Sequence, residues 1–155
     1  MGHVLSIVFD DNHTGHDALV VDLHGNRLRC DSYYFAIDRH VAPAARDGAK
    51  VRLVLRLLLQ RWIATLTALP DGGLTYLPFD YSDEYTGAIE CRRRGDDVDV
   101  RAGWTPVAGW SHAPSDIEPF EKRVAIFHPD EVWPTRSCSL AELVADIRAS
   151  VPASA

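Results

Sequence analysis

The chain has 155 residues, a formal net charge of −6 and a hydrophobic content of 46%. This length fits one domain that can bury a core without disulfides, and the acidic balance lacks the basic footprint of a nucleic-acid-binding protein. Cys30, Cys91 and Cys138 form no CxxC pair, which argues against a secreted disulfide framework and favours a reducing compartment. No signal peptide and no apolar run of about 18 residues is present, so we expect a cytoplasmic protein.

The N-terminal third contains four short segments that are typical of β-strands. Apolar and β-branched residues fill 4–9, 18–23 and 33–38, and a short segment at 27–30 follows a turn that contains Gly25. Because the connections between them are short and polar, we expect these segments to form an antiparallel meander.

The long apolar stretch that follows is predicted to be the core helix, over residues 46–68. Residues 50–59 also alternate between apolar and basic, which leaves a strand as the alternative there. The length of the stretch and its Leu, Arg, Ala and Gln content favour the helix. Pro70 and the two glycines after Asp71 end it. The stripe expected to face the sheet consists of Val51, Leu55, Leu58, Leu59, Trp62, Leu66 and Leu69.

The clearest hairpin of the sequence joins strands 86–93 and 97–104, after a short strand at 74–79 and an acidic loop at 80–85. Arg94-Gly95-Asp96 forms the turn. Alternation along the second strand predicts one apolar face, which consists of Val98, Val100, Ala102 and Trp104.

The C-terminal part is predicted to hold an irregular loop at 104–120, a last strand at 123–127 and a helix at 140–149. Ser139 and Glu142 have the spacing of a capping box at the start of that helix. The order of strands and helices, with hairpins instead of βαβ crossovers, predicts a single α+β domain over 1–150 with a mainly antiparallel sheet. Residues 151–155 are expected to form a disordered tail.

Two groups of polar residues have side chains that metal ions use, but local interpretations are simpler for both. His13 and His16 lie with several Asp residues in a loop, where no helix places the two imidazoles on one face. Asp80, Asp83 and Glu84 lack the alternating oxygen donors and the central Gly of an EF-hand loop. We therefore predict no metal site and no cofactor.

Ser111 and His112 resemble a nucleophile and base, with Asp116 or Glu118 to orient them. Adjacent residues in an extended loop point in opposite directions, and the sequence has neither a G-x-S-x-G elbow nor a phosphate-binding Gly loop. No catalytic residue is therefore assigned. Aromatic residues beside charges, as in Asp80–Tyr85, are instead typical of binding surfaces.

The pattern LPFDYSDEYTG, followed by GW, GWS and PSDI, resembles the central part of small bacterial immunity proteins, the partners of polymorphic or type VI secreted toxins. The resemblance covers about residues 50–120. It implies an acidic, cytoplasmic protein that binds one cognate toxin tightly and blocks its active site.

On this interpretation the acidic loop and the Trp-containing loop face a basic cleft of the toxin. The predicted partner-binding residues are Asp80, Tyr81, Asp83, Glu84, Tyr85, Trp110, Asp116 and Glu118. Two alternatives stay open: a small metal-assisted enzyme built on His13, His16 and His112, and a regulatory or assembly domain that uses the same surface on a housekeeping protein.

Overall fold

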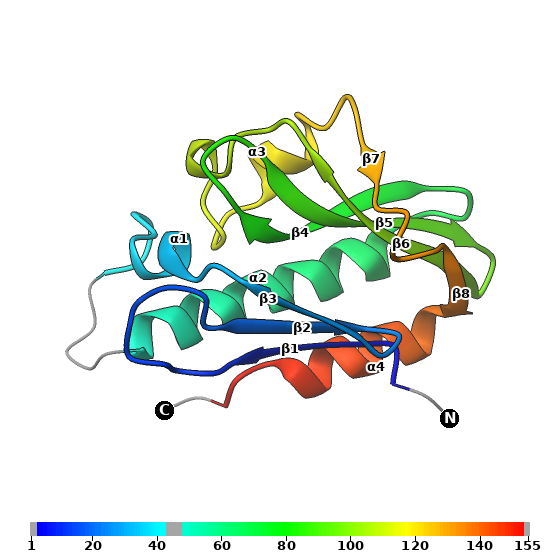
Figure 1. The fold of residues 1–155 in the computed structure, drawn as a ribbon. Helices are drawn as coiled ribbons and strands as arrows, with labels where there is room; N and C mark the ends of the chain where they lie inside the picture. The colour runs from blue at the N-terminus through cyan, green and yellow to red at the C-terminus, as the bar shows by residue number, and fades with distance from the viewer. Residues whose placement is uncertain (1–2, 43–47, 154–155) are drawn as a thin grey trace.

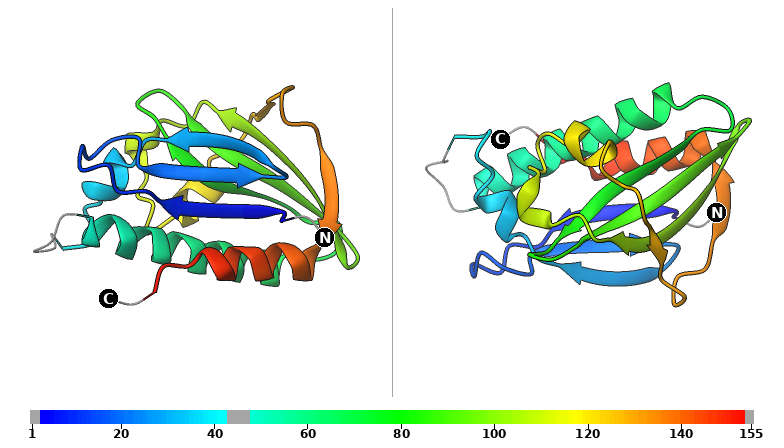
Figure 2. Two further views of the ribbon diagram at one scale, coloured as in Figure 1. Left: turned by 60° about the horizontal axis from the view of Figure 1, so that its bottom comes forward. Right: turned by 90° about the horizontal axis from the view of Figure 1, so that it is seen from above.

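The computed structural model of the protein describes residues 3–42 and 48–153. Two antiparallel β-sheets lie on the same side of two long helices, α2 (Ala49–Ala68) and α4 (Leu140–Ser150), as Figures 1 and 2 show. The predicted α+β class is therefore confirmed. One hydrophobic core is built from side chains of both sheets and of both helices.

The first sheet has the order β1-β2-β3, and the second has the order β4-β5-β6-β7, with β8 also paired to β6. The strands are β1 (Leu5–Phe9), β2 (Leu19–Leu23), β3 (Asn26–Cys30), β4 (Leu74–Tyr81), β5 (Thr86–Arg94), β6 (Asp97–Thr105), β7 (His128–Pro129) and β8 (Arg136–Ser139). Three short helical turns complete the elements: α1 (Tyr33–Ala36), η1 (Gly109–Ser111) and α3 (Glu118–Glu121). The first three strands confirm the N-terminal meander that the sequence predicts.

Helix α2 settles the choice between helix and strand at 50–59 in favour of the helix. All seven residues of the predicted stripe are buried, and Val54 is buried with them. The adjacent pair Val54 and Leu55 is buried together, which a strand with alternating faces would not do. The predicted start of the helix at residue 46 lies outside the described residues.

The strand predicted at 33–38 is wrong, because local hydrogen bonds form the helical turn α1 there. The Asp31 carboxylate accepts a bond from the Tyr33 N–H at 3.0 Å. The Ser32 carbonyl accepts from the N–H groups of Phe35 and Ala36, both at 3.1 Å. These bonds satisfy the backbone within the segment, and the apolar residues that suggested a strand bury only Phe35.

The strand predicted at 123–127 is also wrong. Strand pairing begins only at β7, which pairs with one end of β6. The other end of β6 pairs with β8, a strand that the sequence did not predict. Ile126 is 55% exposed, so its β-propensity is not supported by packing.

The C-terminal helix begins as the capping box predicts. The Ser139 hydroxyl accepts the N–H of Glu142 at 2.9 Å, and Leu143 and Ile147 of α4 are buried. Of the predicted tail 151–155, Val151 packs against the core, and residues 154 and 155 lie outside the described part of the chain.

The β5–β6 hairpin is confirmed, with Ile89 opposite Ala102 and Cys91 opposite Val100 on the core side. Trp104 differs from its three predicted neighbours on that face, because it is 43% exposed at the end of β6. There the core ends and a pocket begins, and this position makes Trp104 part of the candidate site.

Candidate binding site

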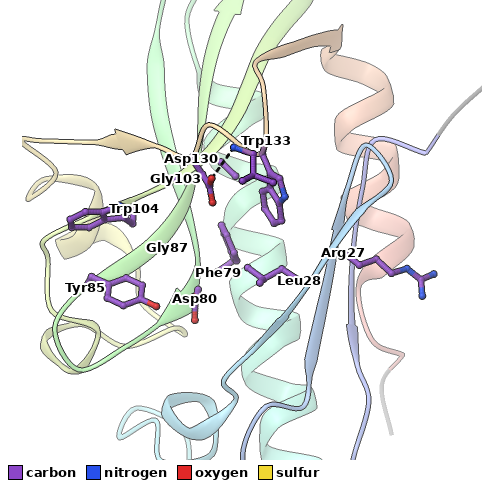
Figure 3. A pocket seen from close by; sticks show the side chains of 12 residues that line it. Arg27, Leu28, Phe79, Asp80, Tyr85, Gly87, Gly103, Trp104, Asp130 and Trp133 are labelled. Atoms are coloured by element: carbon purple, nitrogen blue, oxygen red, sulfur yellow. Dashed lines mark hydrogen bonds between the residues drawn. The ribbon is translucent and has the colours of Figure 1, made fainter.

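A pocket of about 630 Å³ opens between the two sheets, at the end of β4 (Figure 3). We call it the inter-sheet pocket. Its lining includes Leu28 of β3, Phe79 and Asp80 of β4, Tyr85, Gly87 of β5, Trp104 of β6, and Trp133. This volume lies within the range of known ligand sites, and the lining has their usual composition of apolar walls with few polar groups.

A β-bulge in β4 directs Asp80 into this pocket. Pro78 pairs with Ala88 and Asp80 pairs with Gly87, so Phe79 is an extra residue between the two pairs. In a regular strand Asp80 would project from the face opposite to Leu77, but the extra residue returns it to the same face.

Gly87 leaves the floor of the pocket open beside this carboxylate. A Cβ atom at Gly87 would lie 2.7 Å from the Cβ of Asp80, closer than two such atoms can approach. The absence of a side chain at Gly87 is therefore required for the position of Asp80, and it keeps the carboxylate accessible from the pocket.

Aromatic rings form two walls of the inter-sheet pocket. Tyr85 meets Trp104 edge to face with ring centroids 6.1 Å apart, and His128 stacks on Trp104 at 4.4 Å. On the other side Trp133 stacks over Phe79 at 6.4 Å. Both Tyr85 and Trp104 are about two-fifths exposed, at 38% and 43%, so they present open ring surface to a ligand.

The neighbours that shift the pKa of Asp80 within the described part of the chain are other carboxylates and a tyrosine hydroxyl. Burial raises the pKa of Asp80, and the carboxylates of Asp31 and Asp17 raise it further, while a hydrogen bond with Tyr85 lowers it. The Asp80 charge in turn raises the pKa of Tyr85. Arg27, which also borders the pocket, points away from it in Figure 3 and forms an ion pair with Asp22 at 3.3 Å.

A second pocket of about 470 Å³ adjoins the first, because both have Asp80 and Tyr85 in their walls. We call it the acidic pocket. It is lined further by His16, Asp17, Arg29, Asp31, Tyr33, Tyr34, Tyr81, Ser82 and Asp83.

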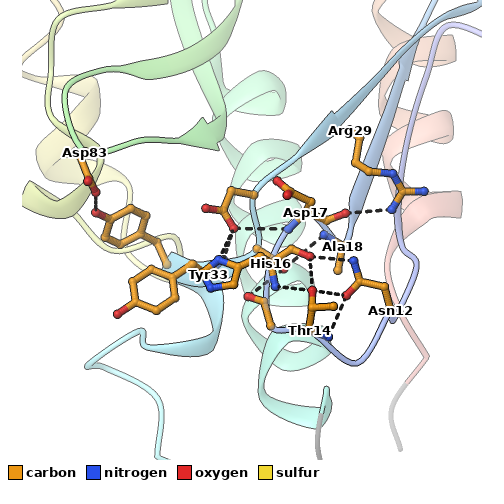
Figure 4. A network of polar contacts seen from close by, with 12 residues as sticks. Asn12, Thr14, His16, Asp17, Ala18, Arg29, Tyr33 and Asp83 are labelled. Carbon is orange, nitrogen blue, oxygen red and sulfur yellow. Dashed lines mark hydrogen bonds and ion pairs between the residues drawn. The ribbon is translucent and has the colours of Figure 1, made fainter.

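Polar contacts hold the walls of the acidic pocket in place (Figure 4). The Tyr34 hydroxyl donates to Asp83, and this bond raises the pKa of Tyr34 to about 12. His16 stacks on Tyr33 with centroids 5.2 Å apart and lies 3.4 Å from Asp31. Loop 10–17 and helix α1 are thereby fixed around the mouth of the pocket.

We call the two adjoining pockets together the cleft. Most of the predicted partner-binding residues of the 80–85 segment lie at the cleft, but the side chain of Tyr81, which borders the acidic pocket, is not exposed there. Asp80, Asp83 and Tyr85 line one or both pockets, and Glu84 is exposed on the same loop. The expectation that Tyr81 is exposed is wrong, because β4 continues through it. Its side chain is buried on the other face of the sheet, against the rings of Phe35 and His112.

The Trp-containing loop packs directly beside the acidic loop. The Gly109 N–H donates to the Ser82 carbonyl at 2.7 Å, and a Cβ atom at Gly109 would meet that oxygen at 2.3 Å. This contact places η1 next to the cleft, with Trp110 62% exposed. Asp116 and Glu118 are exposed as predicted, but neither lines the two pockets, and Glu118 forms an ion pair with Lys122 at 3.1 Å.

The histidines of the metal-assisted alternative are not brought together. His13 and His16 are exposed in the first loop, whereas His112 is buried between Tyr81 and Phe120. Within residues 3–42 and 48–153, no three His, Cys, Asp or Glu side chains are grouped so that they could hold a metal ion.

Ser111 and His112 do not form a nucleophile–base pair. The Ser111 hydroxyl donates to the Ala108 carbonyl at 2.6 Å. The Nε2 atom of His112 instead lies 3.0 Å from the Thr86 hydroxyl, on the buried side of the sheet. Burial, together with the charge of Arg123, lowers the pKa of His112 to about 4.

Sequence reasoning missed several parts of the cleft: Asp17, Asp31, Gly87 and Trp133. Most of them come from distant segments, which no local pattern connects to residues 80–85. One local signal was present, since Pro78 in a strand is typical of an edge or a bulge. The bulge at Phe79 could have been inferred from it.

Comparison with protein-family models, with characterised proteins and with solved structures finds no match for this chain. Among the described residues, no helix has the length and apolar character needed to cross a membrane.

Proposed function

We propose that the protein is a binding protein that neutralises a basic protein partner, and specifically an immunity protein that occludes the active site of a bacterial toxin. The observation that carries this proposal is the acidic and aromatic character of the cleft, where the two arginines that border the pockets among the described residues pair with other carboxylates. Asp80 shares the inter-sheet pocket with the partly exposed rings of Tyr85 and Trp104. Asp83 lines the acidic pocket with Tyr85, and Glu84 is exposed on the same loop.

The chemistry of such a surface suits a partner of opposite charge. Negative potential at the cleft accelerates the encounter with a basic protein and disfavours acidic competitors. Exposed tyrosine and tryptophan side chains are the groups that anchor interfaces, because they bury a large area with few rotatable bonds. The exposed Trp110 beside Ser82 extends the same surface. Inhibition would follow from steric coverage of the partner's active site, without any chemical step by this protein.

The test uses the product of the gene adjacent to this one in its host as the candidate toxin. We expect a complex with that protein and loss of its enzymatic activity in the complex. The double variant Asp83→Lys with Glu84→Lys should weaken the complex by at least about tenfold, because it replaces attraction by repulsion at exposed positions. Affinity is measured by calorimetry, and circular dichroism verifies that the variant is folded.

A matched control carries the same change of charge at the far end of the same sheet. Asp96→Lys with Asp97→Lys lies at the tip of the β5–β6 hairpin, roughly 30 Å along the strands from Tyr85. We expect this control to bind like the unmodified protein. Equal weakening in both double variants would show only a general effect of net charge, and unchanged affinity in the first would remove the acidic loop from the interface.

A further inference from the structure

We propose that the inter-sheet pocket binds an arginine side chain of the partner. The guanidinium group of that arginine pairs with Asp80 and stacks on the rings of Tyr85 and Trp104. The inference rests on the proposed function, since it names the group through which a basic protein partner would be anchored. It concerns the inter-sheet pocket and not the acidic loop as a whole.

The position of the Asp80 carboxylate favours a cation as the ligand. Asp80 lies where the two pockets adjoin, and its described electrostatic neighbours are the carboxylates of Asp31 and Asp17 and the hydroxyl of Tyr85. A half-buried negative charge among other negative charges is unfavourable unless a cation enters. The bulge at Phe79 and the bare floor at Gly87 hold the carboxylate in that position.

The shape and chemistry of the pocket walls favour a guanidinium group. A guanidinium group is planar, stacks on aromatic faces and is weakly hydrated, so it suits a site between aromatic rings and a carboxylate. The apolar stem of an arginine can lie along Phe79, Leu28 and Trp133 while its head reaches Asp80. An ammonium group would gain the charge interaction but less from the ring faces.

The two arginines that border the pockets among the described residues, Arg27 and Arg29, already pair with other carboxylates. Arg27 pairs with Asp22, and Arg29 pairs with Asp10 at 3.0 Å and donates to the Asp17 carbonyl at 2.8 Å. The charge that complements Asp80 is therefore to be supplied from outside the described part of the chain.

The direct test is an NMR titration with N-acetyl-arginine amide, compared with the corresponding lysine amide and with the citrulline amide, a neutral isostere of arginine. We expect saturable shifts of the Trp104 indole and the Gly87 amide with a Kd on the order of 1 mM, the value typical of a ligand of this size. The lysine compound should bind several-fold more weakly, and the citrulline compound should cause no saturable shift.

Two variants connect the titration to the pocket. Asp80→Asn should weaken arginine binding at least tenfold while the protein remains folded, because the change removes an unfavourable buried charge. Asp96→Asn, the same chemical change at the exposed hairpin tip, should leave the titration unchanged. Equal binding of arginine and citrulline, or an Asp80→Asn variant that binds arginine normally, would overturn the proposal.

The outcome separates this inference from the proposed function. A toxin complex that depends on Asp83 and Glu84 but is unaffected by Asp80→Asn would overturn the arginine anchor and leave the immunity function standing. Saturable arginine binding at Trp104, without inhibition of the neighbouring gene product, would overturn the immunity function and leave a guanidinium site.

Discussion

The two faces of the second sheet at the end of β4 contain similar groups and differ in what covers them. Asp80 and Tyr81 are neighbours in sequence, yet Asp80 projects into the open inter-sheet pocket and Tyr81 lies on the opposite, closed face. On the closed face, the His112 ring stacks on Phe120 and lies tilted against Tyr81, and the Thr86 hydroxyl is hydrogen-bonded to His112. On the open face, Tyr85 and Trp104 border the pocket into which the half-buried Asp80 carboxylate projects.

One of these faces is structural and the other is available for binding. Both faces combine aromatic rings with polar atoms, so composition alone does not separate them. The closed face is filled by the protein's own Phe120, which is fully buried. The open face leaves about 630 Å³ to be filled by another molecule. Substitutions should therefore affect mainly stability on the closed face and mainly binding on the open face.

The largest expected effect is on the closed face. Phe120→Ala should lower the free energy of unfolding by about 3–5 kcal/mol, because it removes a fully buried ring and leaves a cavity beside His112. Trp104→Ala on the open face should cost less than about 1 kcal/mol, since that ring is exposed at the pocket mouth. Urea denaturation of both variants measures the two values. Similar costs would mean that the faces are equally structural.

The second prediction concerns the pH dependence of stability on the closed face. His112 is buried as the neutral imidazole, with a pKa of about 4 against its ordinary value of 6.5. Between these values the unfolded chain binds a proton that the folded protein does not, so stability falls as the pH is lowered from 6.5 to 4. The expected contribution of this residue is about 3 kcal/mol over that window.

The His112→Phe variant isolates this contribution. Thr86 keeps its bond to the Val107 carbonyl at 2.7 Å, so the substitution does not leave the hydroxyl unpaired. Denaturation curves at several pH values should show a flatter dependence below pH 6.5 in the variant than in the unmodified protein. Parallel curves would show that His112 is not held neutral by the fold.

The third prediction tests the floor of the open pocket. Gly87→Ala should destabilise the protein by about 1–3 kcal/mol, because the new methyl group would lie 2.7 Å from the Cβ of Asp80. It should also weaken arginine binding. The cost should disappear in an Asp80→Gly background, where the clashing atom is absent, and a double-mutant cycle measures this coupling. Additive effects of the two substitutions would mean that the floor tolerates a side chain.

The parts of this molecule that could be predicted from sequence are those set by local periodicity. The stripe of α2, the β5–β6 hairpin and the Ser139 cap follow from residue spacing alone, and the structure confirms each. The acidic loop was identified from its composition, so Asp83 and Tyr85 were found as cleft residues.

The parts that could not be predicted depend on one inserted residue and on distant segments. The bulge at Phe79 directs the Asp80 side chain into the inter-sheet pocket, and the Tyr81 side chain is buried on the opposite face, whereas the sequence pattern places both residues in one exposed loop. Asp31 reaches the same cleft from the loop between β3 and α1, through tertiary packing that no motif records. The closed face was missed for the same reason, because His112 is buried by Phe120 and Tyr81 and not by its sequence neighbours.

The smallest expected effect on stability is a gain, whereas the substitutions above all lower stability. This effect distinguishes the two faces most directly. Asp80→Asn should raise the free energy of unfolding at neutral pH by on the order of 1 kcal/mol, as is common when a group kept for function is removed. The pKa of Asp80 is raised in the fold, so the folded protein holds this proton more tightly than the unfolded chain does. The ionised carboxylate therefore lowers stability as the pH rises above its ordinary value of 3.8.

Denaturation of the Asp80→Asn variant and of the unmodified protein should thus give curves that diverge as the pH rises from 4 to 7, with the variant the more stable. No residue of the closed face should behave in this way, since its groups are packed for stability. A variant that is both more stable and unable to bind arginine would show that Asp80 lowers the stability of the fold and is needed for binding. A less stable variant would show that Asp80 stabilises the fold. The open face would then have a structural role, as the closed face does.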